Sequence, residues 1–361
     1  MAAHANGAID HAVIRVQLIL QMRYRFVLFA SLLVGALLLL VAAGAETHTR
    51  AGRQERSERA AEPKFDASSI NTPTTESLQQ GDHGSAVARA QILLDRAHFS
   101  CGEIDGNFGS NLEKTVRAFQ QERALPVTSS VDEATWSALN ADRAPPLFAY
   151  TITAEDEKGP FVQVPKDLTA QAKLSFLGYS SPLEELAERF HTTPSLLQAL
   201  NPGTDFDQTG QRLTVPNVLT LPPGEATKVV ISKSESSVRA YDASEKLLAF
   251  YVATIGSEHD PLPIGTWKIR SVIHNPFFHY NASLFWDADD RNARATIHPG
   301  PRNPVGLIWI DLSKEHYGIH GTPDPSLIGH TTSHGCIRLT NWDALDLAEM
   351  VRPAVEADLK E

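Results

Sequence analysis

From about residue 226 onward, the apolar residues change to a period of two, in short runs that are separated by turn residues. This period is typical of β-strands, whose successive side chains point to opposite faces. The expected strands cover residues 229–231, 238–241, 247–255, 266–272 and 308–312. One late helix is expected from Trp342 to Met350, with Asn341 as its cap. Residues 226–352 are therefore predicted to form a mostly β domain, an antiparallel sandwich or a barrel-like core.

Residues 76–140 have helical spacing instead. Ser85 is predicted to cap a first helix, and residues 110–113 (Ser-Asn-Leu-Glu) have the form of a capping box at the start of a second. A third short helix is expected near Asp132, and residues 102–109 supply a glycine-rich turn between the first two. This segment is predicted to be a three-helix bundle that precedes the β domain.

Residues 148–218 are predicted to form a small α+β module. Ser181 combines with a first-turn proline and with Glu184 to mark the start of one helix. A second helix is expected to begin at Thr193. The expected strands cover residues 150–152 and 210–216.

Residues 22–45 are predicted to be a signal peptide or a membrane anchor. Arg23 and Arg25 precede an unbroken apolar run from Phe26 to Ala43. This run is long for a signal-peptide core and just long enough to span a bilayer as a helix. Basic residues before the run place that side in the cytoplasm, so the domains that follow are predicted to be exported.

Two further segments flank this leader. Residues 46–75 are rich in charged and polar side chains and are predicted to be a flexible polar linker. Residues 1–21 are unusual before such a leader, and Met22 followed by Arg makes a more natural start. They are interpreted as an over-extended N-terminus.

Length and charge limit the function classes. A chain of 361 residues has room for about two or three domains. Its 32 basic and 43 acidic residues give a formal net charge of −11. Binding of nucleic acid or of an anionic surface through bulk charge is therefore not expected, and no nucleic-acid partner is predicted.

The two cysteines, Cys101 and Cys336, could form one disulfide in an oxidising compartment. We do not expect this pairing, because it would join two different domains and consume the better nucleophile. Cys101 is predicted to be a small, partly buried residue before the turn at Gly102.

Cys336 is the candidate nucleophile and His320 its candidate base. A thiol attacks as thiolate, and a nearby imidazole is the usual means of forming one near neutral pH. His320 ends an alternating segment, so its side chain is expected to point away from the face that Ile319 buries. The N–H groups of Gly335 and Cys336 are candidates for an oxyanion hole. Arg338 is a natural partner for a substrate carboxylate.

Three alternatives remain open for these residues. Cys336 could be an inert buried thiol. Arg338 could pair with an internal acid such as Asp343. A metal site could be formed by His316, His320, His330, His334 and Cys336. No His-Glu-x-x-His or paired-cysteine motif is present, and metal binding would occupy the best nucleophile, so no metal and no cofactor are predicted.

The segments His320-Gly-Thr and Ser333-His-Gly-Cys-Ile-Arg resemble the signature of the L,D-transpeptidase catalytic domain, the YkuD-like family of bacterial cell-wall enzymes. The resemblance extends to residues 255–256, 263–267, 303–306 and 341. It implies that the carbonyl of Gly321 orients His320 and that His334 belongs to the site. Ser333 and Arg338 are expected to bind substrate.

The earlier segments carry resemblances of their own. Residues 76–140 are similar to the three-helix peptidoglycan-binding domain of wall enzymes, through the Ile104-Asp-Gly-Asn-Phe-Gly turn and the Asp132-Glu-Ala-Thr-Trp segment. Residues 148–218 are similar to a LysM module, a βααβ unit that binds N-acetylglucosamine polymers. Its sugar binding and a purely structural role as a spacer both remain open.

These resemblances imply an exported transferase of peptidoglycan biosynthesis, with roles in cell-wall organisation and cell shape. Cys336 would attack a stem tetrapeptide at the L-centre of its diamino acid, expel the terminal D-alanine and leave a thioester. An amine would then take up the acyl group, as in 3–3 cross-linking or protein attachment. The expected location is the cell envelope outside the cytoplasm, with membrane contact if the leader is retained. The alternatives are an L,D-carboxypeptidase and a non-catalytic wall-binding scaffold.

Overall fold

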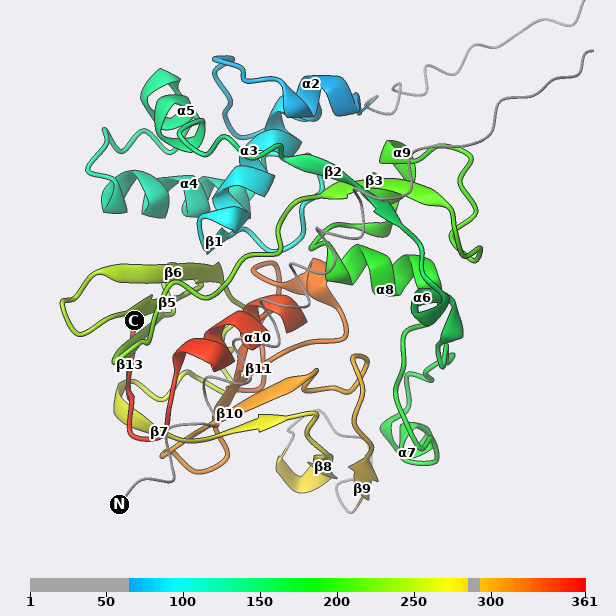
Figure 1. Ribbon diagram of the computed structural model, residues 1–361. Coiled ribbons are helices and arrows are strands. Elements are labelled where there is room, and N and C mark those ends of the chain that lie inside the picture. The colour runs from blue at the N-terminus through cyan, green and yellow to red at the C-terminus, as the bar shows by residue number, and fades with distance from the viewer. Residues whose placement is uncertain (1–64, 285–292) are drawn as a thin grey trace, which may run out of the picture. The chain divides into compact units, whose positions relative to one another are not determined.

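The computed structural model describes residues 65–284 and 293–361 (Figure 1). The predicted N-terminal extension (1–21) and leader (22–45) lie outside the described residues, as does most of the predicted linker (46–75). No helix within the two described ranges has both the length and the apolar character that a bilayer span requires.

The first described segment is helical. It contains α2 (Ala67–Asn71), α3 (Ser85–Arg96), the short strand β1 (Phe99–Ser100), α4 (Ser110–Glu122) and α5 (Glu133–Leu139). Helix α5 begins near Asp132 as predicted, and the Asp132 carboxylate caps it by accepting a backbone N–H from the first turn. The cap predictions for the first two helices are wrong by one residue. Gly84 and Gly109 hold the cap positions, so Ser85 and Ser110 are the first residues of their helices.

Helix α2 corrects the predicted extent of the linker. The carboxylate of Asp66 accepts the backbone N–H groups of Ser68 and Ser69 and so caps this one-turn helix. The side chain of Ile70 is fully buried in a cluster with Ile92 and Ile104. The linker prediction is therefore wrong for residues 67–71, because a single apolar residue in a polar segment gave no period to detect.

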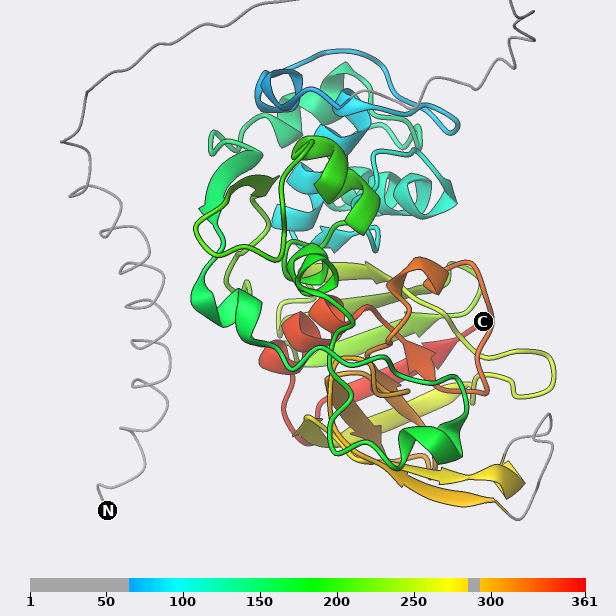
Figure 2. The same ribbon diagram turned by 90° about the vertical axis from the view of Figure 1, so that its right-hand side faces the viewer.

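The next segment has the predicted strand–helix–helix–strand order with two additional short helices. It contains β2 (Leu147–Thr151), α6 (Ala154–Lys158), α7 (Leu168–Gln171), α8 (Pro182–Arg189), α9 (Pro194–Leu200) and β3 (Arg212–Pro216). Strands β2 and β3 pair antiparallel, from Leu147 opposite Pro216 to Thr151 opposite Arg212. The side chains of Ser181 and Thr193 cap α8 and α9. Helix α7 lies away from this pair and contacts β9 (Figure 2).

The remainder of the chain is mostly β, as predicted. Its strands are β4 (Lys228–Ser232), β5 (Ser237–Tyr241), β6 (Leu247–Val252), β7 (Gly265–His274), β8 (Phe278–Asn281), β9 (Arg294–Ile297), β10 (Ile308–Leu312), β11 (Gly318–His320), β12 (Ile337–Arg338) and β13 (Glu356–Lys360). Within the described ranges, one sheet has the order β1-β6-β5-β4-β13-β7-β10-β11-β12, and β8 and β9 form a separate hairpin. Most neighbours are antiparallel, but β1–β6, β4–β13 and β11–β12 are parallel.

Strand β13 extends the β domain beyond the predicted end at residue 352. It lies in the middle of the sheet, parallel to β4 and antiparallel to β7. Only Ala357 and Leu359 are buried on it, between acidic and basic neighbours. Two apolar positions at the end of the chain are too few for a sequence pattern to predict a strand.

Helix α10 (Asn341–Met350) packs Ala344, Leu347 and Met350 into the core of the sheet domain, with Ile310, Ile319 and Ile337 of strands β10, β11 and β12 (Figure 1). Thr340 is its cap and accepts the backbone N–H of Asp343, so the prediction that Asn341 is the cap is wrong. Asn341 is buried, and its side chain bonds three other segments. Its amide accepts the N–H of Leu307 and donates to Glu188 and to the carbonyl of Pro301.

The helical segment and the sheet domain share one apolar core. Strand β1 adds to the sheet edge, with Phe99 opposite Phe250 of β6. Residues of both segments form a single buried cluster: Leu93, Phe99, Phe119 and Trp136 from the helical side, and Leu247, Phe250, Val252 and Ile328 from the sheet side. Cys101 is a buried free thiol in this cluster, in line with its predicted role.

Candidate active site

The register of β11 and β12 places the predicted nucleophile and base on one face of the sheet. The two strands are parallel, with Ile319 opposite Ile337 and His320 opposite Arg338. Residues opposite one another in adjacent strands point the same way, and the direction alternates along each strand. Cys336, one residue before β12, therefore shares the face of His320 and Arg338. The two isoleucines fill the core on the other face.

The imidazole of His320 is held in one orientation. Its Nδ1 lies 2.6 Å from the carbonyl oxygen of Gly321, and its ring stacks on Trp309 with the centroids 5.5 Å apart. A carbonyl can only accept, so Nδ1 carries the proton and Nε2 of the neutral ring is the basic nitrogen. Burial, with only 4% of the residue exposed, and the charge of Arg338 lower the pKa of His320 to about 3. The ring is therefore neutral near pH 7.

The thiol of Cys336 is also neutral at rest. Burial raises its pKa above the ordinary value of 9.0, although a backbone hydrogen bond from Gly318 and the charge of Arg338 act in the opposite direction. The Sγ lies 3.7 Å from the carbonyl oxygen of His316. A neutral thiol and a neutral imidazole on one sheet face differ from a preformed thiolate–imidazolium pair. Attack by this thiol would require its proton to move.

The turn before Cys336 depends on Gly335. Its φ is +99°, and a Cβ at this position would lie 2.8 Å from the ring of Tyr317. The hydroxyl of the buried Ser333 donates to the carbonyl oxygen of Cys336 at 2.5 Å. Ser333 was expected to bind substrate, and here its hydroxyl supports the turn. The backbone N–H groups of Gly335 and Cys336 make no hydrogen bond to a backbone acceptor within the described part of the chain.

Arg338 lies on the same sheet face as His320 and also lines a pocket. The pocket has a volume of about 240 Å³. It is lined by Leu168 and Gln171 of α7, by Thr254, Arg302 and Pro304, by Thr322, Pro323, Asp324, Leu327, Ile328 and Thr331 of the loop between β11 and β12, and by Arg338. The alternative partner of Arg338, Asp343, is engaged elsewhere, because its carboxylate accepts the hydroxyl of Ser100. The carboxylate of Asp324 acts electrostatically on Arg338, and Cys336 would do so when it is a thiolate.

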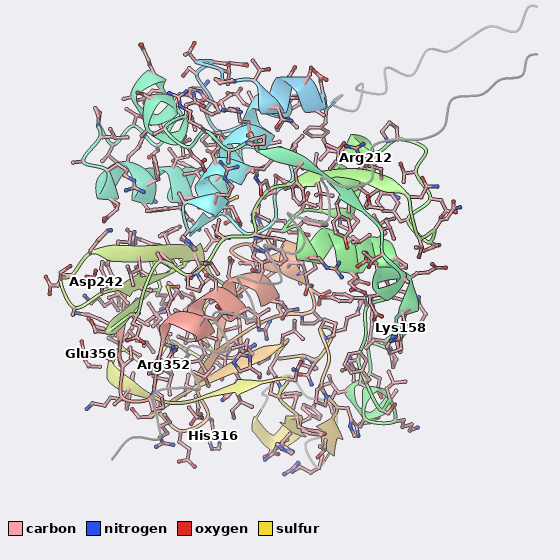
Figure 3. All side chains as sticks on the ribbon, viewed as in Figure 1. Lys158, Arg212, Asp242, His316, Arg352 and Glu356 are labelled. Carbon is pink, nitrogen blue, oxygen red and sulfur yellow. The ribbon has the colours of Figure 1, made fainter. Side chains whose placement is uncertain are left out.

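The other predicted residues lie around this centre. Gly321 supplies the carbonyl that orients His320, as the resemblance implied. His334 is half-buried in the turn before Cys336. His316 and His330 are exposed, and Figure 3 labels His316 in the loop between β10 and β11. Where side chains are described, His, Cys, Asp and Glu residues form no group of three or more that could hold a metal ion.

Sequence reasoning missed Trp309, Tyr317, Gln171 and Arg302. Trp309 could have been found, because it lies in a predicted strand at a position that alternates with the buried Ile308 and Ile310. Tyr317 lies directly before the strand of His320. Gln171 and Arg302 approach the site only through the tertiary fold, and no sequence spacing predicts that approach.

Two family models match the chain. Residues 226–356 match the model described as "L,D-transpeptidase catalytic domain", and residues 83–139 match the one described as "Putative peptidoglycan binding domain". A crystal structure of an L,D-transpeptidase from Xylanimonas cellulosilytica is similar at 15% identity and a TM-score of 0.35, over 80% of this chain and 99% of that one.

Relatives of known sequence agree with the family models. The "Putative L,D-transpeptidase YkuD" of Bacillus licheniformis is 32% identical over 171 residues, which cover 47% of this chain and 87% of the relative. The "Probable L,D-transpeptidase YbiS" of Escherichia coli is 30% identical over 179 residues, which cover 48% of this chain and 58% of the relative. On this similarity, the chain belongs to the L,D-transpeptidase family.

Proposed function

We propose that this protein is an exported peptidoglycan L,D-transpeptidase that works through a cysteinyl thioester. The observation that carries the proposal is the geometry of His320. Its Nδ1 proton is committed to the Gly321 carbonyl, so Nε2 is left as a base on the same sheet face as Cys336. A fixed neutral base beside a thiol is the arrangement that nucleophilic acyl transfer requires.

In the first half-reaction, the Sγ of Cys336 attacks the carbonyl carbon at the L-centre of the stem peptide's diamino acid. His320 takes the thiol proton on Nε2 as the S–C bond forms. The C–N bond to the terminal D-alanine then breaks, and His320 returns the proton to the leaving amine. The enzyme is left as a thioester with a neutral imidazole.

In the second half-reaction, an acceptor amine attacks the thioester carbon. His320 removes a proton from this amine and then protonates the departing sulfur, which restores the thiol. An acceptor amine from a neighbouring stem gives a 3–3 cross-link, and a protein lysine gives an attached protein.

The N–H groups of Gly335 and Cys336 would hold the oxyanion in both half-reactions. Their lack of a backbone acceptor among the described residues supports this role. Removing one such donor typically costs about 3 kcal/mol of transition-state stabilisation. The lowered pKa of His320 keeps the free ring neutral near pH 7, so the lone pair of Nε2 is available to accept a proton.

The helical segment would keep the enzyme on the wall polymer, where a second attachment raises the effective substrate concentration. The predicted leader is consistent with export. Sugar binding by residues 148–218 remains a prediction, with a structural role as the alternative.

The test is incubation of the purified protein with a disaccharide-tetrapeptide, followed by mass analysis of the products. Transpeptidation gives a cross-linked dimer, and hydrolysis by an L,D-carboxypeptidase gives a tripeptide. Unchanged substrate would indicate the non-catalytic scaffold. Cys336→Ala is expected to abolish the thioester, and turnover by this variant would overturn the proposal.

A further inference from the structure

The pocket beside Arg338 is closed by a segment that precedes the sheet domain in the chain. Residues 160–178 leave the β2–β3 module and dock on the loop before β10. Leu177 is fully buried there, where its N–H donates to the carbonyl of Pro299 and its carbonyl accepts the N–H of Arg302. Gly300 permits this approach, because a Cβ there would lie 2.2 Å from the Leu177 carbonyl oxygen. Helix α7 is thereby placed against the pocket.

Residues with unpartnered polar atoms line this pocket. Seven buried side-chain nitrogen or oxygen atoms have no hydrogen-bond partner among the described residues, and three of them belong to residues that line it. They are the Oε1 of Gln171, the Nε of Arg302 and the Nε of Arg338. Folded proteins rarely leave buried polar atoms unpaired, because each costs about 1–3 kcal/mol. Three in one cavity indicate a site whose partners come from a ligand.

The orientation of Gln171 fixes what it can offer. Its Nε2 donates to the carbonyl of Pro165 at 2.8 Å. A carbonyl cannot donate, so the atom that faces it must be the NH₂ group, and Oε1 is the free acceptor. Gln171 is only 8% exposed, so Oε1 is largely withdrawn from water. A ligand group that meets it must donate a hydrogen bond.

The two arginines offer donors to an anion. Arg302 uses Nη1 for an ion pair with Glu184 at 2.8 Å, and its Nε remains unpaired. Arg338 forms no ion pair among the described residues, although the charge of Asp324 acts on it from a longer distance. Guanidinium groups match the planar geometry of a carboxylate. Asp324 adds one negative charge to the lining of the same pocket.

We propose that this pocket binds a zwitterionic amino-acid end, with its carboxylate on Arg338 and Arg302 and its ammonium group on Gln171 and Asp324. The inference rests on the proposed function, because a stem-peptide diamino acid that carries a second carboxyl group supplies such an end on its side chain, beyond the carbonyl that Cys336 attacks. A volume of about 240 Å³ fits a fragment of a ligand and not a whole stem peptide. Gln171 and Arg302 are then specificity residues contributed from outside the catalytic strands.

The test measures binding to the full chain carrying Cys336→Ala, so that no chemistry interferes. Three probes are compared by calorimetry: the disaccharide-tetrapeptide, its form with the side-chain carboxyl amidated, and its form with the side-chain amine acetylated. Each modification is expected to weaken binding about tenfold, the usual effect of losing a charge-assisted hydrogen bond. Arg302→Gln should reduce the penalty of amidation, and Gln171→Leu should reduce the penalty of acetylation, with Arg338 and Asp324 accounting for what remains.

Gln163→Leu is the matched control, because Gln163 lies in the same docked segment with an exposed side chain. It should keep both penalties. Alkylation of Cys336 by iodoacetamide in otherwise wild-type protein checks that each variant still folds around the nucleophile. Equal affinity for the three probes, or penalties in both pocket variants that are as large as in the parent protein, would overturn the inference.

Turnover assays separate this inference from the proposed function. If the wild-type protein converts the tetrapeptide but the three probes bind alike, the pocket assignment fails and the transpeptidase proposal stands. If the probes bind as expected but wild-type protein converts none of them, the transpeptidase proposal fails and the pocket assignment stands. If the folded protein neither binds nor converts them, both are wrong.

Discussion

The side-chain amide of Asn111, in helix α4, donates a hydrogen bond of 2.8 Å to the carbonyl oxygen of Ile328, in the loop between the strands of His320 and Cys336. The next residue, Gly329, has a φ of +76°. It packs against Asn111 so closely that a Cβ at Gly329 would lie 2.3 Å from the side-chain oxygen of Asn111. The hydroxyl of Thr254 holds the same loop from the other side, through the carbonyl of Leu327 and the N–H of Gly329. A residue of the helical segment therefore positions a loop that lines the pocket beside Arg338.

Asn111→Ala is expected to lower turnover several-fold, because losing a hydrogen bond worth about 1 kcal/mol loosens this loop. The measurement is kcat and KM for the tetrapeptide together with urea unfolding. Gln121→Ala, which truncates an exposed amide on the same helix, should leave both unchanged. If the two variants behave alike, the loop does not depend on this contact.

Alkylation of Cys336 by iodoacetamide is expected to accelerate about tenfold per pH unit between about pH 6 and 8. The pKa of this thiol is raised above 9.0 by burial, so the thiolate fraction grows with pH across the whole interval. Quenching the reaction at set times and mapping the peptides by mass gives the alkylation rate of Cys336 separately from that of Cys101. Burial raises the pKa of Cys101 well above the ordinary value. A rate that stays level over this interval would mean that a thiolate–imidazolium pair exists before substrate binds.

Gly321→Ala is expected to reduce kcat at least tenfold. The new Cβ would lie 2.2 Å from the Oδ1 of Asn341, and because three hydrogen bonds hold the Asn341 amide, the backbone at Gly321 is expected to shift. That shift moves the carbonyl that holds His320 at 2.6 Å. Gly109→Ala is the control, since nothing lies within 4 Å of a Cβ there. The measurement is tetrapeptide turnover by the two variants. A Gly321→Ala variant with full activity would show that the position of the Gly321 carbonyl is not needed for catalysis.

Asp343→Asn is expected to make the protein more stable at pH 8 than the wild type. Burial and the nearby charge of Asp95 raise the pKa of Asp343 to about 8, while the unfolded value is 3.8. The folded state thus keeps a proton that the unfolded state releases, so stability falls as pH rises between these two values. Asparagine resembles the protonated acid and can still accept the hydroxyl of Ser100. We expect a gain on the order of 1–3 kcal/mol at pH 8.

Urea unfolding at several pH values measures this effect. His191 lies in the same cluster, paired with Asp95 at 3.0 Å and stacked on Trp342. Burial lowers the pKa of His191, but the charge of Asp95 outweighs burial and the pKa is raised. The stabilisation that the protonated His191 gives to the folded state is therefore also lost as pH rises through its folded-state pKa. The contrasting variant is Asp346→Asn, which loses an ion pair with His98 at 3.1 Å and should destabilise the protein. A steep pH dependence that persists in Asp343→Asn would assign the titration to another group.

The sequence predicted the types of the main elements better than their ends, and the catalytic roles of Cys336 and His320 stay predictions. Cys336 and His320 were identifiable because glycines and alternating residues surround them, and a local pattern determines the face on which they lie. The caps at Ser85, Ser110 and Asn341 were misplaced by one residue, because a serine or asparagine at the first helical position looks the same as one at the cap. Only backbone angles separate the two positions.

Other features depend on contacts between distant segments. Strand β13 is central in the sheet although its own sequence is weakly apolar, because β4 and β7 supply the burial. Gln171 belongs to a helix of four residues, too short for any period to reveal. Its role emerges only when Leu177 docks on the loop that carries Arg302.

The parallel pairing of β1 with β6 has a practical consequence for work on this enzyme. A fragment that began near residue 226 would lack β1, so one edge of β6 would be unpaired and Phe250 and Val252 would be exposed to water. Such an unprotected strand is a site for intermolecular aggregation. Poor behaviour of an isolated catalytic fragment would therefore reflect an exposed sheet edge and not a fault in its chemistry.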